Sequence, residues 1–361
     1  MPNMLIYQPI KKGGGTMGKI DVISKWNLNL ALWEEASHDL RGRSFAFANY
    51  DPVINASYHD VNYIIFSWGN RVEDLSKDTI NIKNHKAQIS TILNYLKKAS
   101  SANYNVIYYM LDADAPLIED AKKLAALVDN LSLLPNTCSI NIMGHSKCGA
   151  INMYIPRFFQ NEKSFDLTSL YNISTPYSGT ILASPLIFYP KVKDLIISKF
   201  GNSDFSNKIY NSLINLYESI SSNSHMDYDI AKNGGIPKEL LNKYDESFIQ
   251  NIACKENIDA IKNISSFKNF TTRIDKQTLS KAVIHADFDS IGLCLLDNWF
   301  FENDSDGFVQ TSDQKIVEEY LSINSIDLIS THNLGTSKEF YKVLNEVSIN
   351  SVNKHFQRLR R

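Results

Sequence analysis

Apolar runs and amphipathic stretches alternate along the first half of the chain. Val61–Ser67 and Tyr104–Leu111 are mostly apolar runs of strand length, which is typical of strands buried on both faces of a sheet. Between them, apolar residues recur every three or four positions from about Asn84 to Ser100, as on one face of a helix. Pro116–Leu134 repeats this helical spacing, and Pro135 is placed to end it.

A further strand and an abrupt turn follow in Ser139–Ala150, which reads SINIMGHSKCGA. Its apolar first half leads into a turn of small residues with Ser146 at the apex, and a helix-compatible run continues to about Phe159. Leu167–Ser174 is again typical of a strand. Strands and helices therefore alternate across residues 61–180, which predicts a mostly parallel sheet with helices on both faces.

The alternation changes after residue 180. Residues 181–280 contain helix-like stretches and no evident strand pair, which predicts a mostly helical cap inserted after a sheet strand. The other expected elements are a helix at Ser24–Arg41, short strands within Phe45–Tyr58, strands at Ala282–Phe288 and Ser325–Ser330, and helices at Ser312–Leu321 and from Ser337 onward. The expected divisions are a flexible leader at 1–20, an α/β core at 21–180 and 281–352, the helical cap at 181–280, and a basic, frayed tail at 353–361.

Composition excludes several classes of protein. The chain has 361 residues, of which 43% are hydrophobic and 21% charged, and its net charge of −2 predicts no broad basic surface for nucleic acid. Its four cysteines lack metal-ligand spacing and are expected to be reduced thiols, with a single disulfide left open. No apolar run approaches the roughly 20 residues of a membrane span, and the N-terminus shows no signal-peptide core. We therefore expect a cytoplasmic location by default, and leave open export by a route without a signal.

Ser146 is the first candidate for catalytic chemistry. A serine hydroxyl needs a general base within hydrogen-bond reach and a carboxylate that orients this base. In doubly wound hydrolases these residues follow the chain order Ser, Asp or Glu, then His, which Ser146, Asp306 and His332 reproduce. Asp304 is the alternative acid, but Gly307 permits a tight turn that would present the carboxylate of Asp306.

An oxyanion pocket requires two hydrogen-bond donors. The expected donors are the backbone N–H of Lys147, which follows the serine, and that of Asn70, in the turn after the Val61–Ser67 strand. We expect His145 to be structural. Cys148 is a rival nucleophile, although a thiol on the first helical turn is expected to pack against the sheet. This chemistry requires no metal and no organic cofactor.

Several short motifs together carry a family resemblance. GHSKCG, with Ser146, resembles the GHSxGG nucleophile turn of lipases, and IIFSWGN resembles the FRG[ST] oxyanion turn of class 3 lipases and places Asn70 there. ISTPYSGT, ENDSDGFVQTS and THNLGTSKEFYKVL resemble three segments of bacterial triacylglycerol lipases, the second matching Asp306 to the catalytic acid and the third His332 to the base. One departure is Cys148, where the lipase motif has glycine. The matches lie within residues 61–180 and 299–345.

The resemblance implies an α/β-hydrolase fold of the lipase/esterase type with a helical cap. It implies a serine hydrolase that cleaves carboxylic esters through Ser146, Asp306 and His332 by way of an acyl-enzyme. The alternatives are a phospholipase, thioesterase or acyltransferase using the same site, or a non-catalytic binding protein with a hydrolase fold. The expected partner is a small-molecule ester or a lipid, with contact to a lipid surface and the oligomeric state left open.

Overall fold

The structure is a computed structural model. It describes residues 4–7, 20–23, 44–48, 61–67, 92, 94–96, 98–99, 103–109, 117–133, 136–177, 185–221, 252–301, 304–332, 334 and 338–359. The helix predicted at Ser24–Arg41 lies outside these residues.

One sheet organises the described part of the chain, with its nine strands in the order β2-β1-β3-β5-β4-β6-β7-β8-β9. The strands are β1 (Met4–Tyr7), β2 (Ile20–Ile23), β3 (Ser44–Ala48), β4 (Val61–Ser67), β5 (Asn103–Tyr109), β6 (Thr137–His145), β7 (Thr168–Ile173), β8 (Ser266–Arg273) and β9 (Ile326–Ile329). All neighbouring pairs from β5 to β9 are parallel, whereas β1, β2 and β3 add an antiparallel end. The prediction of a mostly parallel central sheet is confirmed.

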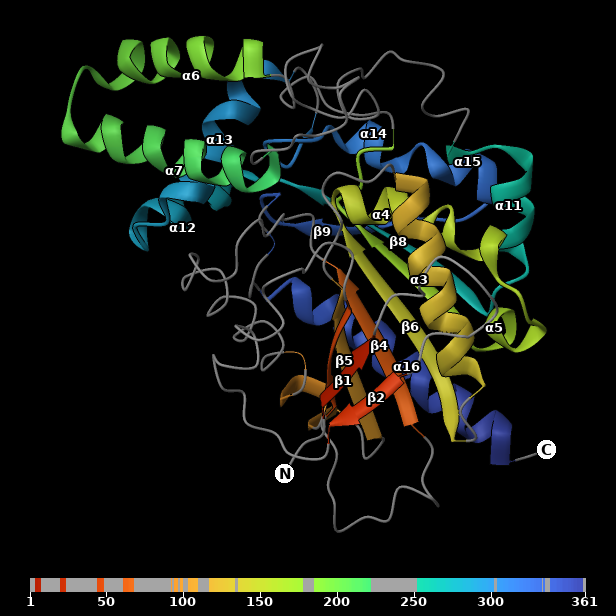
Figure 1. The fold of residues 1–361 in the computed structure, drawn as a ribbon. Helices are drawn as coiled ribbons and strands as arrows, with labels where there is room; N and C mark the ends of the chain where they lie inside the picture. The colour runs from red at the N-terminus through yellow and green to blue at the C-terminus, as the bar shows by residue number, and fades with distance from the viewer. Residues whose placement is uncertain are drawn as a thin grey trace.

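Helices cover both faces of this sheet (Figure 1). They are α3 (Leu117–Ser132), α4 (Lys147–Asn152), the 3₁₀ helix Ile155–Phe158, α5 (Glu162–Leu167), α6 (Pro185–Phe200), α7 (Asp204–Ser221), α11 (Lys255–Lys262), α12 (Lys276–Ile284), α13 (Phe288–Phe300), α14 (Thr311–Lys315), α15 (Val317–Leu321) and α16 (Phe340–Leu359). Residues 92, 94–96 and 98–99 are helical too, in the predicted helix between β4 and β5. In the part of the chain that the structure describes, no helix is long and apolar enough to cross a membrane.

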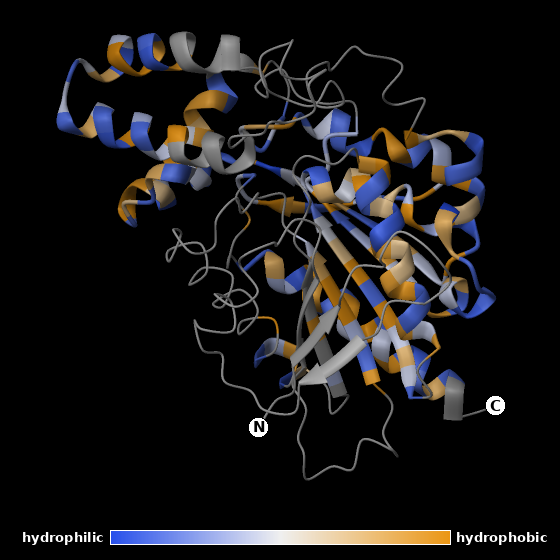
Figure 2. Ribbon diagram, viewed as in Figure 1, coloured by the Kyte–Doolittle hydropathy of each residue, from blue (hydrophilic) through white to orange (hydrophobic). Residues whose placement is uncertain are grey.

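The alternation of side chains along the strands explains the two layers of helices. In β4, Tyr63 and Ile65 pack in the apolar cluster under α3, while Ile64 and Phe66 pack in the cluster under α16. Because both sets are buried, apolar side chains of β4 point to both faces of the sheet, and orange residues recur along its central strands in Figure 2. Each large apolar side chain buried in this way contributes about 1.5–3 kcal/mol to folding.

A separate group of helices lies beyond the end of the sheet. α6 and α7 run side by side away from the sheet, and α12 and α13 pack beneath them (Figure 1). We call these four the cap helices. Their shared apolar core, the cap cluster, consists of Val192, Ile196, Ile209, Leu213, Ala282, Ile291, Leu293, Leu295, Leu296, Phe308 and Val309. The last two residues belong to the loop after α13, so the cap cluster reaches the edge of the sheet.

Four expectations about the elements are wrong. β8 lies inside 181–280, which was expected to be a mostly helical cap without strand pairs, and it extends the parallel sheet between β7 and β9. Ala282–Phe288 does not resume the sheet, because it spans the end of α12 and the start of α13. Helix α16 continues to Leu359, so most of the expected frayed tail is helical, and Met4–Tyr7 of the expected leader is a sheet strand.

The strand β8 escaped prediction because several of its inward side chains are polar. Asn269, Thr271 and Thr272 are buried, and each has hydrogen-bond partners from distant parts of the chain. A buried polar group of this kind is tolerated only when it is paired. Its partners are a property of the fold, so the local pattern of SFKNFTTR resembles an exposed segment.

Candidate active site

Ser146 lies at a sharp bend between β6 and α4. Its backbone has φ 56° and ψ −128°, a region that residues other than glycine rarely adopt. Two glycines make the bend compact: a Cβ on Gly144 would lie 2.6 Å from the carbonyl oxygen of Cys148, and one on Gly149 would lie 1.8 Å from Oγ1 of Thr175. The strand and the helix can therefore approach closely on both sides of the serine.

Cys148 fits this bend without being a glycine. Its side chain is buried, and its Sγ accepts a hydrogen bond from the hydroxyl of Ser67 at the end of β4 over 3.2 Å. Burial raises the pKa of the Cys148 thiol to about 12. As expected, the thiol packs against the sheet, and at neutral pH it is protonated and poorly suited to act as a nucleophile.

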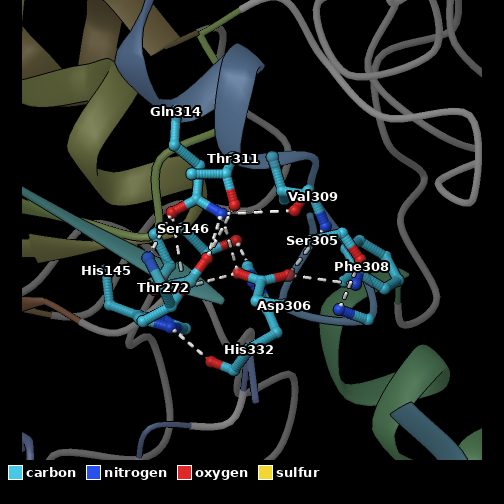
Figure 3. Close-up of polar contacts among 12 residues, drawn as sticks. His145, Ser146, Thr272, Ser305, Asp306, Phe308, Val309, Thr311, Gln314 and His332 are labelled. Atoms are coloured by element: carbon cyan, nitrogen blue, oxygen red, sulfur yellow. Dashed lines mark hydrogen bonds and ion pairs between the residues drawn. The ribbon is translucent and has the colours of Figure 1, made fainter. Parts of the chain in front are cut away.

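The structure brings Ser146, His332 and Asp306 into one hydrogen-bonded row (Figure 3). Nε2 of His332 lies 3.0 Å from Oγ of Ser146, and Nδ1 of His332 lies 2.8 Å from Oδ2 of Asp306. His332 follows β9, and the three side chains are almost fully buried. They therefore meet at the carboxyl ends of the parallel strands, where sites of open α/β sheets gather.

The geometry determines the protons in this row when the imidazole is neutral. A carboxylate can only accept hydrogen bonds, so Nδ1 of His332 carries the proton shared with Asp306. Nε2 then carries a lone pair directed at the hydroxyl of Ser146. This is the tautomer that a base for the serine needs.

Asp304, the alternative acid, contacts a different part of the chain. Asp304 is largely exposed and pairs with Arg273 at 3.6 Å, whereas Asp306 is fully buried. Oδ1 of Asp306 accepts the backbone N–H groups of Phe308 and Val309, at 3.0 and 2.8 Å. The turn depends on Gly307, whose φ is 89° and whose added Cβ would lie 2.4 Å from a backbone oxygen of α13.

His145 holds the main chain of His332 in place. Nε2 of His145 lies 2.8 Å from the carbonyl oxygen of His332, which can only accept, so this nitrogen carries a proton. Burial lowers the pKa of His145 well below its usual value, and the neighbouring His332 lowers it further. The N–H of His332 in turn donates to the carbonyl oxygen of Asp306 over 2.8 Å. The backbone of His332 is thus fixed on two sides.

Sequence reasoning missed two residues whose side chains contact the carboxylate of Asp306. Thr272, near the end of β8, lies 2.7 Å from Oδ2 of Asp306 through its Oγ1, and Nε2 of Gln314 on α14 lies 3.2 Å from the same oxygen. Both are fully buried (Figure 3). The signal that could have found Thr272 is its place at the carboxyl end of a strand, which was hidden because β8 itself was not predicted.

Of the two expected oxyanion donors, the structure places one. Lys147 is the first residue of α4, so its backbone N–H lies at the start of a helix directly after Ser146. Asn70 lies outside the described residues. Within those residues, no group of three or more His, Cys, Asp or Glu side chains is placed to hold a metal ion.

The chain matches no protein-family model and no curated protein sequence. It is similar to the mature form of a Bacillus licheniformis lipase, with 12% identity over 84% of this chain and 97% of that one, at a TM-score of 0.40. It is also similar to a peroxisomal α/β-hydrolase of Saccharomyces cerevisiae, with 10% identity over 87% and 82% of the two chains, at a TM-score of 0.44. For Est1E from Butyrivibrio proteoclasticus the values are 12% identity, 88% and 98% coverage, and a TM-score of 0.39.

The fold is the α/β-hydrolase fold that the sequence predicts. A mostly parallel sheet has helices on both faces, and the serine bend follows one of its central strands. His332 follows the last strand, β9, at the same edge of the sheet.

Proposed function

We propose that this protein is a serine hydrolase that cleaves carboxylic esters. The observation that carries the proposal is the row of Ser146, His332 and Asp306, with its two hydrogen bonds of 3.0 and 2.8 Å, behind a strained serine bend. A serine, a correctly protonated imidazole and a buried carboxylate in this order supply the groups that acyl transfer to a hydroxyl requires.

In the proposed reaction, Oγ of Ser146 attacks the ester carbonyl while Nε2 of His332 takes its proton. Asp306 stabilises the imidazolium that forms. The backbone N–H of Lys147 donates to the oxyanion, and Asn70 is proposed as the second donor. His332 then gives its proton to the leaving alcohol, which produces an acyl-enzyme that water hydrolyses by the same steps.

The test combines a covalent probe with turnover. We expect a fluorophosphonate probe to label the full-length protein at Ser146 and p-nitrophenyl esters to be hydrolysed. Ser146→Ala should abolish both signals, whereas Ser198→Ala, which removes an exposed hydroxyl on α6, should leave both unchanged. A protein that is neither labelled nor active on any ester would be a binding scaffold instead, and the proposal would be wrong.

A matched pair of substitutions tests the acid. Asp306→Asn should lower kcat by about 10⁴-fold, because an amide cannot hold the imidazole in the required tautomer. Asp304→Asn should change kcat by less than about twofold, because that carboxylate is exposed and paired with Arg273. Equal losses in the two variants would contradict the assignment.

The same assay, run with varied substrates, tests which esters the protein prefers. Esters of increasing acyl length, with and without detergent micelles, separate a lipase from an esterase, and thioesters, phospholipids and alcohol acceptors test the related reactions. Peripheral contact with a lipid surface would show as a rise in activity on long-chain esters above the micelle concentration.

A further inference from the structure

Two hydroxyl side chains lie beside the carboxylate of Asp306 at the ends of neighbouring strands. Ser174 directly follows β7, and Thr272 is the next-to-last residue of β8. Oγ1 of Thr272 lies 2.7 Å from Oγ of Ser174 and 2.7 Å from Oδ2 of Asp306. All three residues are fully buried, so water does not compete for these contacts.

The backbone at Ser174 is held in an uncommon conformation. Its φ is 51°, and its N–H donates to the carbonyl oxygen of Phe270 in β8 over 2.9 Å. Ser146 shows the same arrangement one strand earlier, with φ 56° and an N–H that donates to Ile173 of β7. A non-glycine residue with positive φ persists only where its surroundings enforce it. The position of the Ser174 hydroxyl is therefore fixed by the sheet.

The directions of the hydrogen bonds follow from the groups involved. The carboxylate of Asp306 only accepts, so the single hydroxyl proton of Thr272 is directed at Oδ2. Oγ1 of Thr272 can then accept the proton of Ser174. Gln314 braces this pair: its Oε1 accepts the backbone N–H of Thr272 over 2.7 Å, and its Nε2 lies 3.0 Å from the carbonyl oxygen of Thr272.

The oxygen that receives the Thr272 proton is the one that binds His332. Oδ1 of Asp306 is occupied by backbone N–H groups, whereas Oδ2 accepts from Nδ1 of His332, from Thr272 and, over 3.2 Å, from Nε2 of Gln314. Hydrogen bonds to a charged acceptor are strong, and the donors on one oxygen share its negative charge; of the two that accompany His332 here, Thr272 is the nearer, at 2.7 Å against 3.2 Å for Gln314. The Thr272 hydroxyl therefore limits how strongly Oδ2 stabilises a protonated His332, besides fixing the direction of the carboxylate.

We propose that Thr272 is a positioning residue for the acid Asp306, with Ser174 orienting its hydroxyl, and that this pair sets the pH dependence of the base His332. The inference rests on the proposed serine hydrolase function. A purely structural role would affect stability alone and would leave the pH dependence unchanged.

Two substitutions at one position separate these roles. Thr272→Val keeps the shape and removes the hydroxyl, whereas Thr272→Ser keeps the hydroxyl and removes a methyl group. We expect Thr272→Val to lower kcat on the order of 10-fold with little change in KM, and to move the acid limb of the kcat/KM profile upward by about half a pH unit. Thr272→Ser should retain kcat within about threefold, with an unshifted acid limb.

Ser174→Ala provides a second route if Thr272→Val folds poorly. It leaves Thr272 in place but removes the donor that orients it, so we expect a smaller shift of the acid limb in the same direction. Acid limbs that coincide in wild type, Thr272→Val and Ser174→Ala would overturn the proposal. Equal losses of kcat in Thr272→Val and Thr272→Ser without a shift would do the same.

A readout independent of turnover separates this inference from the proposed function. In ¹⁵N-histidine-labelled protein, the Nδ1 proton of His332 should resonate at a different field in Thr272→Val than in wild type and Thr272→Ser. If wild type neither reacts with a fluorophosphonate nor hydrolyses esters but this shift is present, the proposed function fails and the positioning role stands. If wild type is active and the resonance does not move, the positioning role alone fails.

Discussion

Replacing Cys148 by glycine would give the serine bend the residue found there in the lipase motif. The structure predicts that this change destabilises the protein. The close approaches of the bend occur at Gly144 and Gly149, whereas the Cys148 side chain fills space beside Ser67. Glycine at position 148 would therefore empty a packed site.

The size of the effect can be worked from the two atoms removed. Deleting one buried methyl-sized group costs about 1 kcal/mol, and alanine is a better helix former than cysteine by about 0.5 kcal/mol. Cys148→Ala should thus cost about 0.5–1 kcal/mol. Cys148→Gly loses the Cβ as well and about 1 kcal/mol of helix propensity, so its cost should be about 2–3 kcal/mol.

Thermal unfolding of the two variants provides the assay. An unfolding entropy of about 2.1 cal/mol/K per residue over 361 residues makes 3 kcal/mol equal to a fall in Tm of about 4 °C. Cys148→Ala serves as the control, with a fall of about 1 °C. Both variants should hydrolyse p-nitrophenyl esters within a few-fold of wild type, because Cys148 does not contact the reacting atoms. A Cys148→Gly protein as stable as wild type would refute this account of the bend.

Three further predictions concern His145, Gly307 and the thiol of Cys148. The pKa of buried His145 is lowered, so as the pH falls below about 6.5 the unfolded chain takes up a proton at this residue before the folded protein does. The free energy of unfolding should therefore fall with decreasing pH by up to about 1.4 kcal/mol per pH unit. Denaturant unfolding at pH 8 and pH 5 should show a shallower pH dependence for His145→Gln than for wild type, and an unchanged dependence would contradict the assignment. Gly307→Ala should lower kcat at least 10-fold, because the added Cβ would press on the backbone of α13. The control is Gly201→Ala, at a residue with φ 69° and open space around it, which should lower stability by about 1 kcal/mol and leave kcat unchanged. Equal effects on kcat would refute the turn argument. Iodoacetamide at pH 8 should not modify Cys148 in the folded protein, whose thiol pKa is about 12, and rapid modification detected by mass spectrometry would show that the site opens.

The apolar runs of the sequence predict the centre of this fold well. β4 and β6 are buried on both faces, and α3 presents one apolar stripe, so local pattern and tertiary environment agree. The serine bend is equally local, because its small residues, strand and helix are adjacent in the chain. These parts could be predicted because the residues that determine each of them lie within about 20 positions of one another in the sequence.

The parts that escaped prediction depend on distant partners. Asn269 is buried in β8 because Tyr177 and Ser325 supply its hydrogen bonds, and neither is near it in sequence. Thr272 and Gln314 reach Asp306 only after β8 and α14 have taken their places in the fold. Chain order suggested the acid and the base, but it contains no information on which side chains surround them.

Phe308 and Val309 belong both to the cap cluster and to the loop after α13 that holds Asp306, which has a consequence for engineering. Their side chains pack with the cap helices, while their backbone N–H groups hold Oδ1 of Asp306. The ring of Phe308 also lies 5.2 Å from that of His332. If the proposed function holds, a cap transplanted from a hydrolase to change substrate range would also need to recreate the contacts that hold Asp306. Random mutagenesis of the cap cluster should then yield variants slow on every substrate more often than variants with a new preference.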